Sequence, residues 1–397
     1  MPVIASIAYR KILNSHVDFT AEFMIRFEDG SVGWGASPKG ETISIYEDQN
    51  IPVSPESIIR QMEKDGCFGK PFDQEIFDDY LAGRIDRFGR NNAYSLSLAF
   101  FGATQVTHSP FELFGRKEGR LDPPRLSCNI LNGGWHAYTN SVLSDFSEFM
   151  LVAANSDIET VVAGHNAIQK AVKENLRTLE TTVVGGNRVH KFSTADNRAP
   201  IEFLLQIREK LGLSRQFDLM IDASASDLWK GNAYRLTITD GSVRTSDEFR
   251  EYWQGIIRDF GLVYLEDPLH ENDEEAWSAL TAAQGTCRII GDNFYSSDAE
   301  RIARGAAKGC THGVIIKPNQ AGSVTAVRRA VEAAQRHGQI LIASHRSIST
   351  EETFLSLLAC MTSMPFIKIG PLETDYSSVV RLNEIIRLTR DLGRQTL

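Results

Sequence analysis

The sequence predicts an α/β protein in which a (βα) barrel follows a smaller α+β capping domain. From about residue 200, short apolar runs alternate with amphipathic helical stretches, a pattern typical of a parallel sheet whose strands are joined by helices. A chain of 397 residues is too long for one ordinary core. It contains neither GxGxxG nor GxxxxGKS/T, which would favour an open nucleotide-binding sheet. "RLDPPRLS" breaks the earlier pattern, so we expect a capping domain over residues 1–122 and a barrel over residues 123–397.

The capping domain is predicted to combine strands and helices. "ASIAYRKIL" and "DFTAEFMIRFEDGSVGWG" are typical of strands, and a hairpin turn at Asp29–Gly30 divides the second. A loop-like stretch, "ASPKGETISIYED", follows. "SPESIIRQME" opens with a helix N-cap, and "NNAYSLSLAFFGATQV" is a largely apolar helix.

Six apolar runs predict barrel strands: "FDLMID", "LVYLED", "RIIGD", "GVIIK", "QILIASH" and "FIKIG". Helical stretches such as "SVTAVRRAVEAAQRHG" lie between them, with their apolar residues on one face. Each run ends on polar residues, in order Asp222, Glu266, Asp292, Lys317, Ser344–Ser347 and Lys368. In a barrel these ends point to one face, where barrel enzymes hold their active sites, so the side chains are expected to converge.

Three of these strand ends are acids, and together they predict a metal site. At about 5 Å and an effective dielectric near 20, each converging pair costs roughly 3 kcal/mol. Three pairs cost on the order of 10 kcal/mol, comparable to the stability of a whole domain. A divalent cation held by Asp222, Glu266 and Asp292 removes that cost, and oxygen ligands in a small hydrated site favour Mg²⁺. The competing interpretation, that each acid is a helix cap or a loop residue, fits one acid better than three.

Two lysines end the fourth and the sixth of these runs and are candidates for acid–base chemistry. An exposed lysine has a pKa of about 10.4 and is no base at neutral pH, but burial and a nearby cation both lower that pKa. Lys317 or Lys368 could then remove a proton from the carbon beside a metal-bound carboxylate. Either lysine alone could equally be salt-bridged or solvated. "SHRS" adds an anion site, because the guanidinium fork of Arg346 and the neighbouring hydroxyls suit phosphate or carboxylate.

Composition excludes several classes of function. The net charge is −9 and no stripe of Lys and Arg is present, so no nucleic-acid surface is expected. No apolar run approaches the roughly 18–20 residues of a membrane span, and the N-terminus lacks the features of a secretory signal, which leaves the cytoplasm as the expected location. The five cysteines are scattered without CxxC spacing, which favours buried free thiols.

The order of these motifs resembles the enolase family. "FDLMIDASAS", "LVYLEDP", "RIIGDNF", "IIKPNQAGS", "ASHRS" and "FIKIG" are similar to the barrel of that family. Upstream, "LNGGWHAYTNSVLSDFSEFM" resembles the family's Asn–Gly–Gly–Ser–His–Ala…Gln–Glu–Phe–Met segment, and "ASPKGETISIYED" resembles its mobile phosphate-covering loop. The resemblance runs from about residue 30 to the end of the chain and implies an enolase-type barrel with an N-terminal capping domain.

The resemblance implies a role for each matched residue. Asp222, Glu266 and Asp292 would hold Mg²⁺, Lys317 would abstract the proton α to a carboxylate, and Lys368 would stabilise the enediolate together with the metal.

Six further positions match the family's site. Four of them would bind the substrate: Thr42 lies in the loop, His345 would lie beside the substrate, and Arg346 and Ser347 would bind the phosphoryl group. His136 and Glu148 match the loop histidine and the first of two catalytic glutamates.

The chain departs from the family where a leaving group is expelled. The family has a second glutamate in an Asp–Glu–Gly–Gly stretch, and here "TTVVGGNRVHK" places Val183–Val184 at that point. A valine cannot donate a proton, so another group would have to supply the acid. The candidates are His136, Glu148, Arg188, His190 and Lys191. Trp135 and Thr42 also replace serines of the family.

The leading interpretation is a Mg²⁺-dependent lyase of the enolase type. It would form an enediolate and expel a β-group, water, from 2-phosphoglycerate or a phosphorylated or phosphonate analogue. Retained Arg346 and Ser347 favour such a small anionic substrate and point to enolase-like enzymes of phosphonate and phosphinate antibiotic pathways, such as carboxyphosphonoenolpyruvate synthase. An epimerase or tautomerase that eliminates nothing, or a non-catalytic paralogue, remains the alternative. Family analogy also implies a homo-oligomer, a dimer or a larger assembly.

Overall fold

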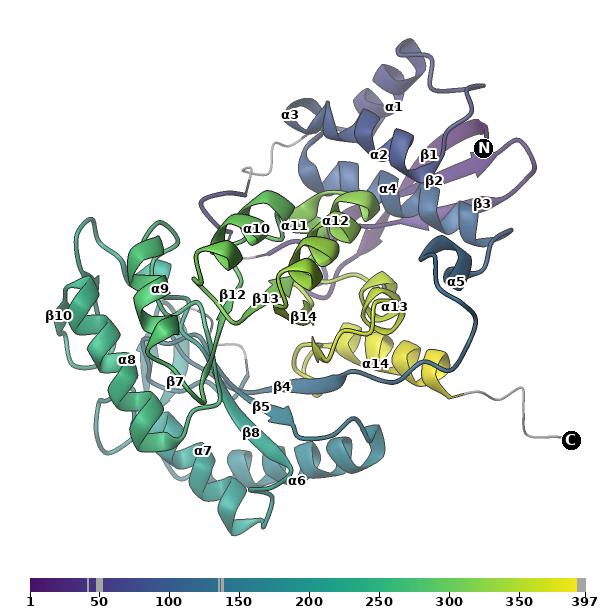
Figure 1. The fold of residues 1–397 in the computed structure, drawn as a ribbon. Coiled ribbons are helices and arrows are strands. Elements are labelled where there is room, and N and C mark those ends of the chain that lie inside the picture. Colours follow the sequence, from purple (N-terminus) through teal and green to yellow (C-terminus); the bar gives the residue numbers. More distant parts are fainter. Residues whose placement is uncertain (41–42, 48–52, 135, 137–138, 391–397) are drawn as a thin grey trace, which may run out of the picture.

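The protein was analysed as a computed structural model, which describes residues 1–40, 43–47, 53–134, 136 and 139–390 (Figure 1). Two groups of elements follow each other along the chain. An antiparallel sheet with five helices comes first, and a closed eight-stranded barrel with its helices comes second. Every helix in these ranges is too short or too polar to cross a membrane.

The N-terminal sheet has three strands in the order β1-β2-β3. Gly30, at a φ of 89°, makes the turn between β2 and β3 that the sequence predicts. Helix α4 packs against this sheet so closely that a Cβ at Gly33 would stand 2.1 Å from the backbone of Ala99 and Ala103. The elements are β1 (Ile4–Leu13), β2 (Phe19–Phe27), β3 (Val32–Gly35), α1 (Pro55–Lys64), α2 (Gln74–Ala82), α3 (Ile85–Phe88), α4 (Arg90–Gln105) and α5 (Pro110–Leu113).

The barrel closes in the order β11-β12-β13-β14-β15-β4-β5-β8. It is not fully parallel, since β5 runs antiparallel to both of its neighbours. Its strands are β4 (Arg125–Asn132), β5 (Glu148–Ala153), β8 (Phe217–Asp222), β11 (Tyr264–Glu266), β12 (Arg288–Gly291), β13 (Gly313–Ile316), β14 (Ile340–Ser344) and β15 (Phe366–Lys368). All six runs chosen from the sequence are strands of this barrel.

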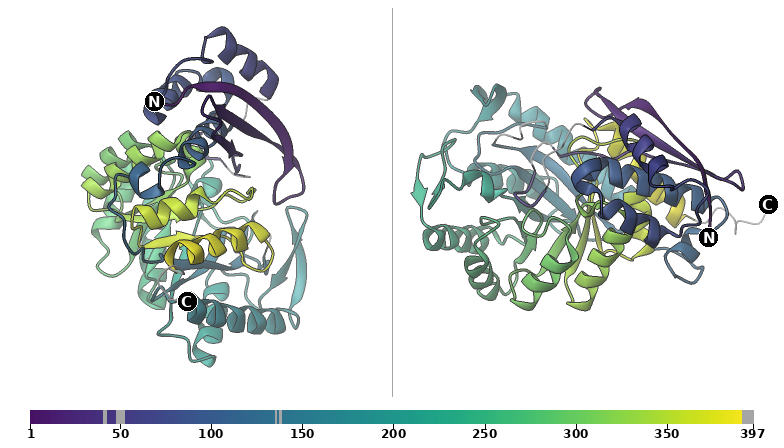
Figure 2. Two further views of the ribbon diagram at one scale, coloured as in Figure 1. Left: turned by 90° about the vertical axis from the view of Figure 1, so that its right-hand side faces the viewer. Right: turned by 90° about the horizontal axis from the view of Figure 1, so that it is seen from above.

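The connections carry the remaining elements. Helix α11 packs against α4, and α12 packs against α2, α4, β13 and β14, which places the N-terminal elements beside this part of the barrel (Figure 1 and the two views of Figure 2). These elements are α6 (Ile158–Leu176), β6 (Glu180–Val184), β7 (Asn187–Lys191), α7 (Ala199–Lys210), the 3-10 helix η1 (Ala225–Leu228), β9 (Tyr234–Arg235), β10 (Val243–Arg244), α8 (Ser246–Phe260), α9 (Glu274–Ala282), α10 (Ala299–Ala307), α11 (Pro318–Ala321), α12 (Val324–Arg336), α13 (Phe354–Met361) and α14 (Tyr376–Thr389).

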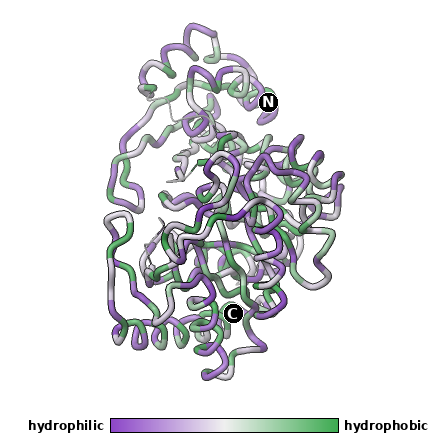
Figure 3. Tube along the Cα trace, turned by 90° about the vertical axis from the view of Figure 1, so that its left-hand side faces the viewer, coloured by the Kyte–Doolittle hydropathy of each residue, from purple (hydrophilic) through white to green (hydrophobic). Residues whose placement is uncertain are grey.

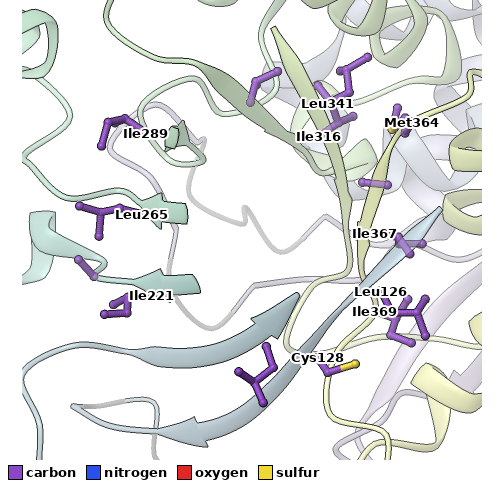
Figure 4. Close-up of a cluster of buried hydrophobic side chains, with 14 of the residues drawn as sticks. Leu126, Cys128, Ile221, Leu265, Ile289, Ile316, Leu341, Met364, Ile367 and Ile369 are labelled. Atoms are coloured by element: carbon purple, nitrogen blue, oxygen red, sulfur yellow. The ribbon is translucent and has the colours of Figure 1, made fainter. Parts of the chain in front are cut away.

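The strands of the barrel bury side chains on both faces. One face forms an inner cluster to which β5, β8 and β11–β15 contribute, including Met220, Ile315 and Phe366. The other face joins a larger cluster that includes the covering helices, and Figure 4 shows Ile221, Leu265 and other members of it. In Figure 3 the hydrophobic residues gather in the middle of the molecule, and hydrophilic residues recur along the helices around it. All five cysteines are buried free thiols.

Candidate active site

One cavity of about 90 Å³ lies where the barrel strands end. It is lined by Gly40, Asn132, His136, Ser147, Glu148, Asp222, Ser224, Asp292, Asn293, Lys317, Ser344, His345, Arg346, Ser347 and Lys368. The structure therefore brings together nine of the eleven residues singled out from the sequence. Glu266 is not a lining residue, but both of its oxygens lie 2.9 Å from Nζ of Lys368, which is one. Thr42 lies outside the described residues, as does Trp135.

Strand periodicity explains why these side chains meet. Alternate residues of a strand point to the same face, and each of the three strand-end acids and both lysines stands two positions beyond a member of the inner cluster. Asp222 follows Met220 in this way, and Lys368 follows Phe366. The apolar residue fills the barrel interior, so its polar neighbour on the same face must lie at the mouth.

Glu148 reaches the same mouth by a different route. It is the first residue of β5, and because β5 is antiparallel it pairs with Asn132 and Asp222, the last residues of β4 and β8. Its Oε1 accepts a hydrogen bond of 2.9 Å from Asn129 Nδ2, and its Oε2 lies 2.8 Å from Lys368 Nζ. Oε1 of Glu148 is therefore hydrogen-bonded, and its Oε2 is ion-paired.

Lys368 lies at the centre of the acidic groups. Its Nζ is 2.9 Å from both oxygens of Glu266 and 3.4 Å from Asp222 Oδ2. Burial lowers the pKa of Lys368, but the surrounding carboxylates outweigh burial and raise that pKa well above its usual value. The expectation of a lowered pKa is wrong for this lysine, because the acids around it favour its charged form.

Lys317 is paired with one acid. Its Nζ donates to Asp292 Oδ2, and its backbone N–H donates to Ser297 Oγ at 2.8 Å. The other oxygen of Asp292 is buried and has no hydrogen-bond partner among the described residues. The backbone N–H groups of Asp292 and Asn293 donate to Asp267 at 2.9 and 2.8 Å, which fixes this turn.

The acids carry more charge than the lysines balance. Burial and the charge of Asp222 raise the pKa of Glu266 well above its usual range. Burial also raises the pKa of Asp222, but Lys368 and Lys317 outweigh it and leave that pKa lowered.

The chemistry of the donors, though not the spacing of the acids, suits a hard divalent cation. Four carboxylates share this region with two ammonium groups, which leaves an excess of two negative charges when all are ionised. The donors are oxygens, and within the described part of the chain one oxygen of Asp292 lacks a hydrogen-bond partner. Within the described ranges, no group of three or more His, Cys, Asp or Glu side chains is arranged to hold a metal ion. Instead, three of the carboxylates surround the ammonium of Lys368.

The expected anion-binding side of the cavity contains a contact that the sequence did not predict. Arg346 is buried, and its two terminal nitrogens lie 3.2 Å from the carboxylate of Glu47. Gln320 Nε2 donates to the same carboxylate at 2.7 Å. Glu47 belongs to the loop that resembles the phosphate-covering segment, so a carboxylate of this loop already contacts the arginine expected to bind phosphate.

His345 is held neutral. Burial lowers its pKa well below the usual value, and the charges of Arg381, Lys368 and Lys317 act in the same direction. Its Nδ1 lies 2.8 Å from the carbonyl oxygen of Arg346, so Nδ1 carries the proton and Nε2 is an acceptor.

His136 is the cavity residue best suited to donate a proton. Its Nε2 is 3.5 Å from Asp227 Oδ2 of η1, a partner that the sequence did not indicate. Burial lowers the pKa of His136, but the negative charge of Asp227, together with those of Asp222 and Glu148, outweighs burial and raises that pKa.

The β6–β7 hairpin supplies no acid to this cavity. Val184 packs against Leu143 and Val189 in a small apolar cluster. His190 pairs with the carbonyl oxygen of Ser141 at 2.9 Å. The three candidate acids of the hairpin, Arg188, His190 and Lys191, are not among the lining residues. Of the five candidate acids, only His136 and Glu148 line the cavity.

Comparison with known proteins agrees with this geometry. The family model "Enolase, C-terminal TIM barrel domain" matches residues 123–397. Proteins named enolase from Halobacterium salinarum and Natronomonas pharaonis are each 30% identical to the chain, and each alignment covers 98% of this chain and 99% of the relative. Enolase from Acidothermus cellulolyticus is 30% identical over 99% of this chain and 95% of its own length. The chain belongs to the enolase superfamily.

Proposed function

We propose that the protein is a Mg²⁺-dependent lyase of the enolase type. It would remove the proton α to a carboxylate and expel a β-group from 2-phosphoglycerate or from a phosphorylated or phosphonate analogue. The observation that carries this proposal is that Lys317, Lys368 and Arg346 meet three carboxylates, those of Glu148, Asp222 and Asp292, in one cavity, with Glu266 against Lys368. The enolase-named relatives support the same reaction class.

The three strand-end acids would hold the metal. Asp222, Glu266 and Asp292 offer oxygen donors and negative charge that the lysines do not balance. Bound there, Mg²⁺ would supply positive charge beside the substrate carboxylate.

The two lysines would divide the proton chemistry between them. Lys317 is the candidate base, and it lies at the edge of the acidic group, paired with one acid. Lys368 is held in its charged form by carboxylates. It would therefore stabilise the negative charge that the substrate gains when the proton leaves.

His136 is the preferred acid for loss of the β-group. Glu148, the other candidate in the cavity, accepts from Asn129 and lies against Lys368, so it would have to break these contacts to carry a proton. His136 has a raised pKa and the carboxylate of Asp227 behind it.

Turnover of 2-phosphoglycerate with Mg²⁺, followed as the absorbance of phosphoenolpyruvate, tests the proposal. Lys317→Ala is expected to lower the rate by on the order of 10²–10⁴-fold. Turnover that is unchanged in this variant would exclude Lys317 as the base. Exchange of the α-proton with solvent but no unsaturated product would show that the base acts and that the leaving group differs.

An epimerase or tautomerase is the second candidate. It is favoured by one observation: Val184 lies in an apolar cluster, and the hairpin that carries it contributes no acid to the cavity. Deuterium from solvent at the α-carbon, with inversion or isomerisation and no elimination from any substrate tested, would establish this alternative.

We also propose that the protein forms a homo-oligomer. Large apolar side chains are exposed around the turn between β1 and β2, where Val17 is 74% and Phe19 72% accessible. Sedimentation velocity would test this, and Phe19→Ser is expected to weaken the association.

A further inference from the structure

A second cavity, of about 180 Å³, adjoins the active-site cavity and plays no part in the proposed reaction. It is lined by Ser15, His16, Asn129, Asn132, Thr139, Glu148, His345, Ser347, Pro371, Thr374 and Asp375. Four of these residues also line the active-site cavity, namely Asn132, Glu148, His345 and Ser347. A cavity needs a volume of only about 15 Å³ to hold one water molecule. This side cavity therefore has room for several non-hydrogen atoms of a ligand.

The walls of the side cavity are held in place. Ser15 and His16 come from the β1–β2 turn, and Ser15 N–H donates to the carbonyl oxygen of Ser349 at 2.8 Å. Ser349 N–H donates back to Ser15 Oγ at 3.0 Å. On the barrel side, the hydroxyls of Thr139 and Thr374 lie 3.0 Å apart. Residues far apart in the sequence therefore form this cavity jointly.

The side cavity is polar, and one buried acceptor in its wall lacks a donor. Asn129 is buried, and its amide nitrogen donates to Glu148 and to Asn132, which fixes the orientation of the amide. Its Oδ1 has no hydrogen-bond partner among the described residues. A buried acceptor in that state is costly, and Asn129 is one of the residues that line this cavity.

Each of the two carboxylates in the wall has partners of its own. Glu148 lies 2.8 Å from Lys368. Asp375 accepts from the N–H and hydroxyl of Ser377 at 2.9 and 2.6 Å, and lies 3.9 Å from Arg381. An anionic group in the cavity would be repelled by these carboxylates at close range. An apolar group would leave the polar groups of the wall without hydrogen-bond partners. A neutral group that donates hydrogen bonds fits best.

We propose that the side cavity receives a hydroxyl-bearing extension of the substrate. The substrate would then be a phosphorylated hydroxy acid with a carbon chain longer than the three atoms of phosphoglycerate. This inference rests on the proposed function, because the shared wall places the extension beside Glu148 and Ser347 only if the reacting group occupies the active-site cavity.

Exchange of the α-proton in D₂O, measured by NMR with Mg²⁺, tests the inference. The probes are 2-phosphoglycerate and the 2-O-phosphorylated aldonates of four and five carbons. The wild-type protein is expected to exchange the longer acids with kcat/KM about tenfold higher, the effect of one added hydrogen bond. Thr374→Phe fills the cavity and is expected to abolish this preference. Thr374→Val, of nearly the same volume as threonine, is expected to keep it.

The outcomes separate the two proposals. Exchange of 2-phosphoglycerate with no preference for the longer acids would overturn the side-cavity inference and leave the proposed function standing. A preference that survives in Thr374→Phe, with the fold confirmed by circular dichroism, would also overturn it. If neither the short nor the long acids exchange, the proposed function is wrong and the inference falls with it.

Discussion

Glu148 and Asp222 lie directly opposite each other on the antiparallel strands β5 and β8. One is the first residue of its strand and the other is the last, yet both carboxylates line the same cavity. The ammonium of Lys368 contacts both, at 2.8 and 3.4 Å. The reversed direction of β5 therefore adds an acid to the mouth of the barrel, and a buried lysine compensates part of the resulting charge.

Removal of that lysine should expose the charge imbalance. Lys368→Met leaves the surrounding carboxylates without their main cation, and breaking a buried pair costs about 3–5 kcal/mol. We expect a lower free energy of unfolding in EDTA, measured by urea titration. Added Mg²⁺ should restore more stability to this variant than to the wild type. Lys210→Met, at an exposed position, is the control. If Mg²⁺ raised the free energy of unfolding equally in Lys368→Met and Lys210→Met, the proposed arrangement would be contradicted.

Metal binding should depend on the acid that has an unpartnered oxygen. If Mg²⁺ binds as proposed, it raises the free energy of unfolding by about 2.7 kcal/mol at a concentration 100 times its Kd. Asp292→Asn should lose most of this gain, whereas Asp122→Asn, at an exposed position, should keep it. Thermal unfolding with and without Mg²⁺ measures the difference. A full Mg²⁺ response in Asp292→Asn would remove this residue from the metal site.

The pair of His136 and Asp227 should determine the alkaline side of the pH–rate profile. Asp227 raises the pKa of His136, so Asp227→Asn should lower that pKa. Because the acid form of His136 would be needed, the fall in kcat at high pH should begin at a lower pH in the variant. His190→Ala, in the hairpin that does not line the cavity, should leave the profile unchanged. An unshifted profile in Asp227→Asn would exclude His136 as the acid.

Much of this site could be predicted from the sequence, because strand periodicity is local. Apolar runs that end on polar residues identified six barrel strands and the three acids at their ends. The direction of β5 could not be predicted in this way, since it depends on pairing between strands far apart in sequence. Glu47, Asp227 and Asp267 were missed for a related reason: each lies in a loop or a short helical turn and acts through a distant partner.

The pKa of Lys368 shows a second limit of sequence reasoning. Burial alone would lower it, and the sequence reveals that a strand-end lysine is buried. It does not reveal how many carboxylates contact the amine, and these contacts determine the direction of the shift.

Burial of Glu271, the acid that accepts hydrogen bonds from the loop at Ser44, should make stability depend on pH. Ser44 Oγ donates to Glu271 at 2.5 Å and the N–H of Ile45 donates at 3.2 Å, while burial raises the pKa of Glu271 to about 7. The unfolded carboxyl titrates near 4.3, so the folded protein binds more protons between these two values. Stability contributed by protonated Glu271 is complete below the lower pKa and is lost as pH rises towards 7. The loss is roughly 3 kcal/mol.

Glu271→Gln isolates this contribution. The amide oxygen can still accept from Ser44 and Ile45, but the side chain no longer ionises. The free energy of unfolding of the variant, relative to the wild type, should therefore rise between pH 5 and pH 8, as measured by urea titration across that range. Glu275→Gln, an exposed neighbour, should show no such trend. If the difference in free energy of unfolding between Glu271→Gln and the wild type stayed constant from pH 5 to pH 8, Glu271 would be ionised over this whole range. Ser44 and Ile45 would then bind it as a carboxylate.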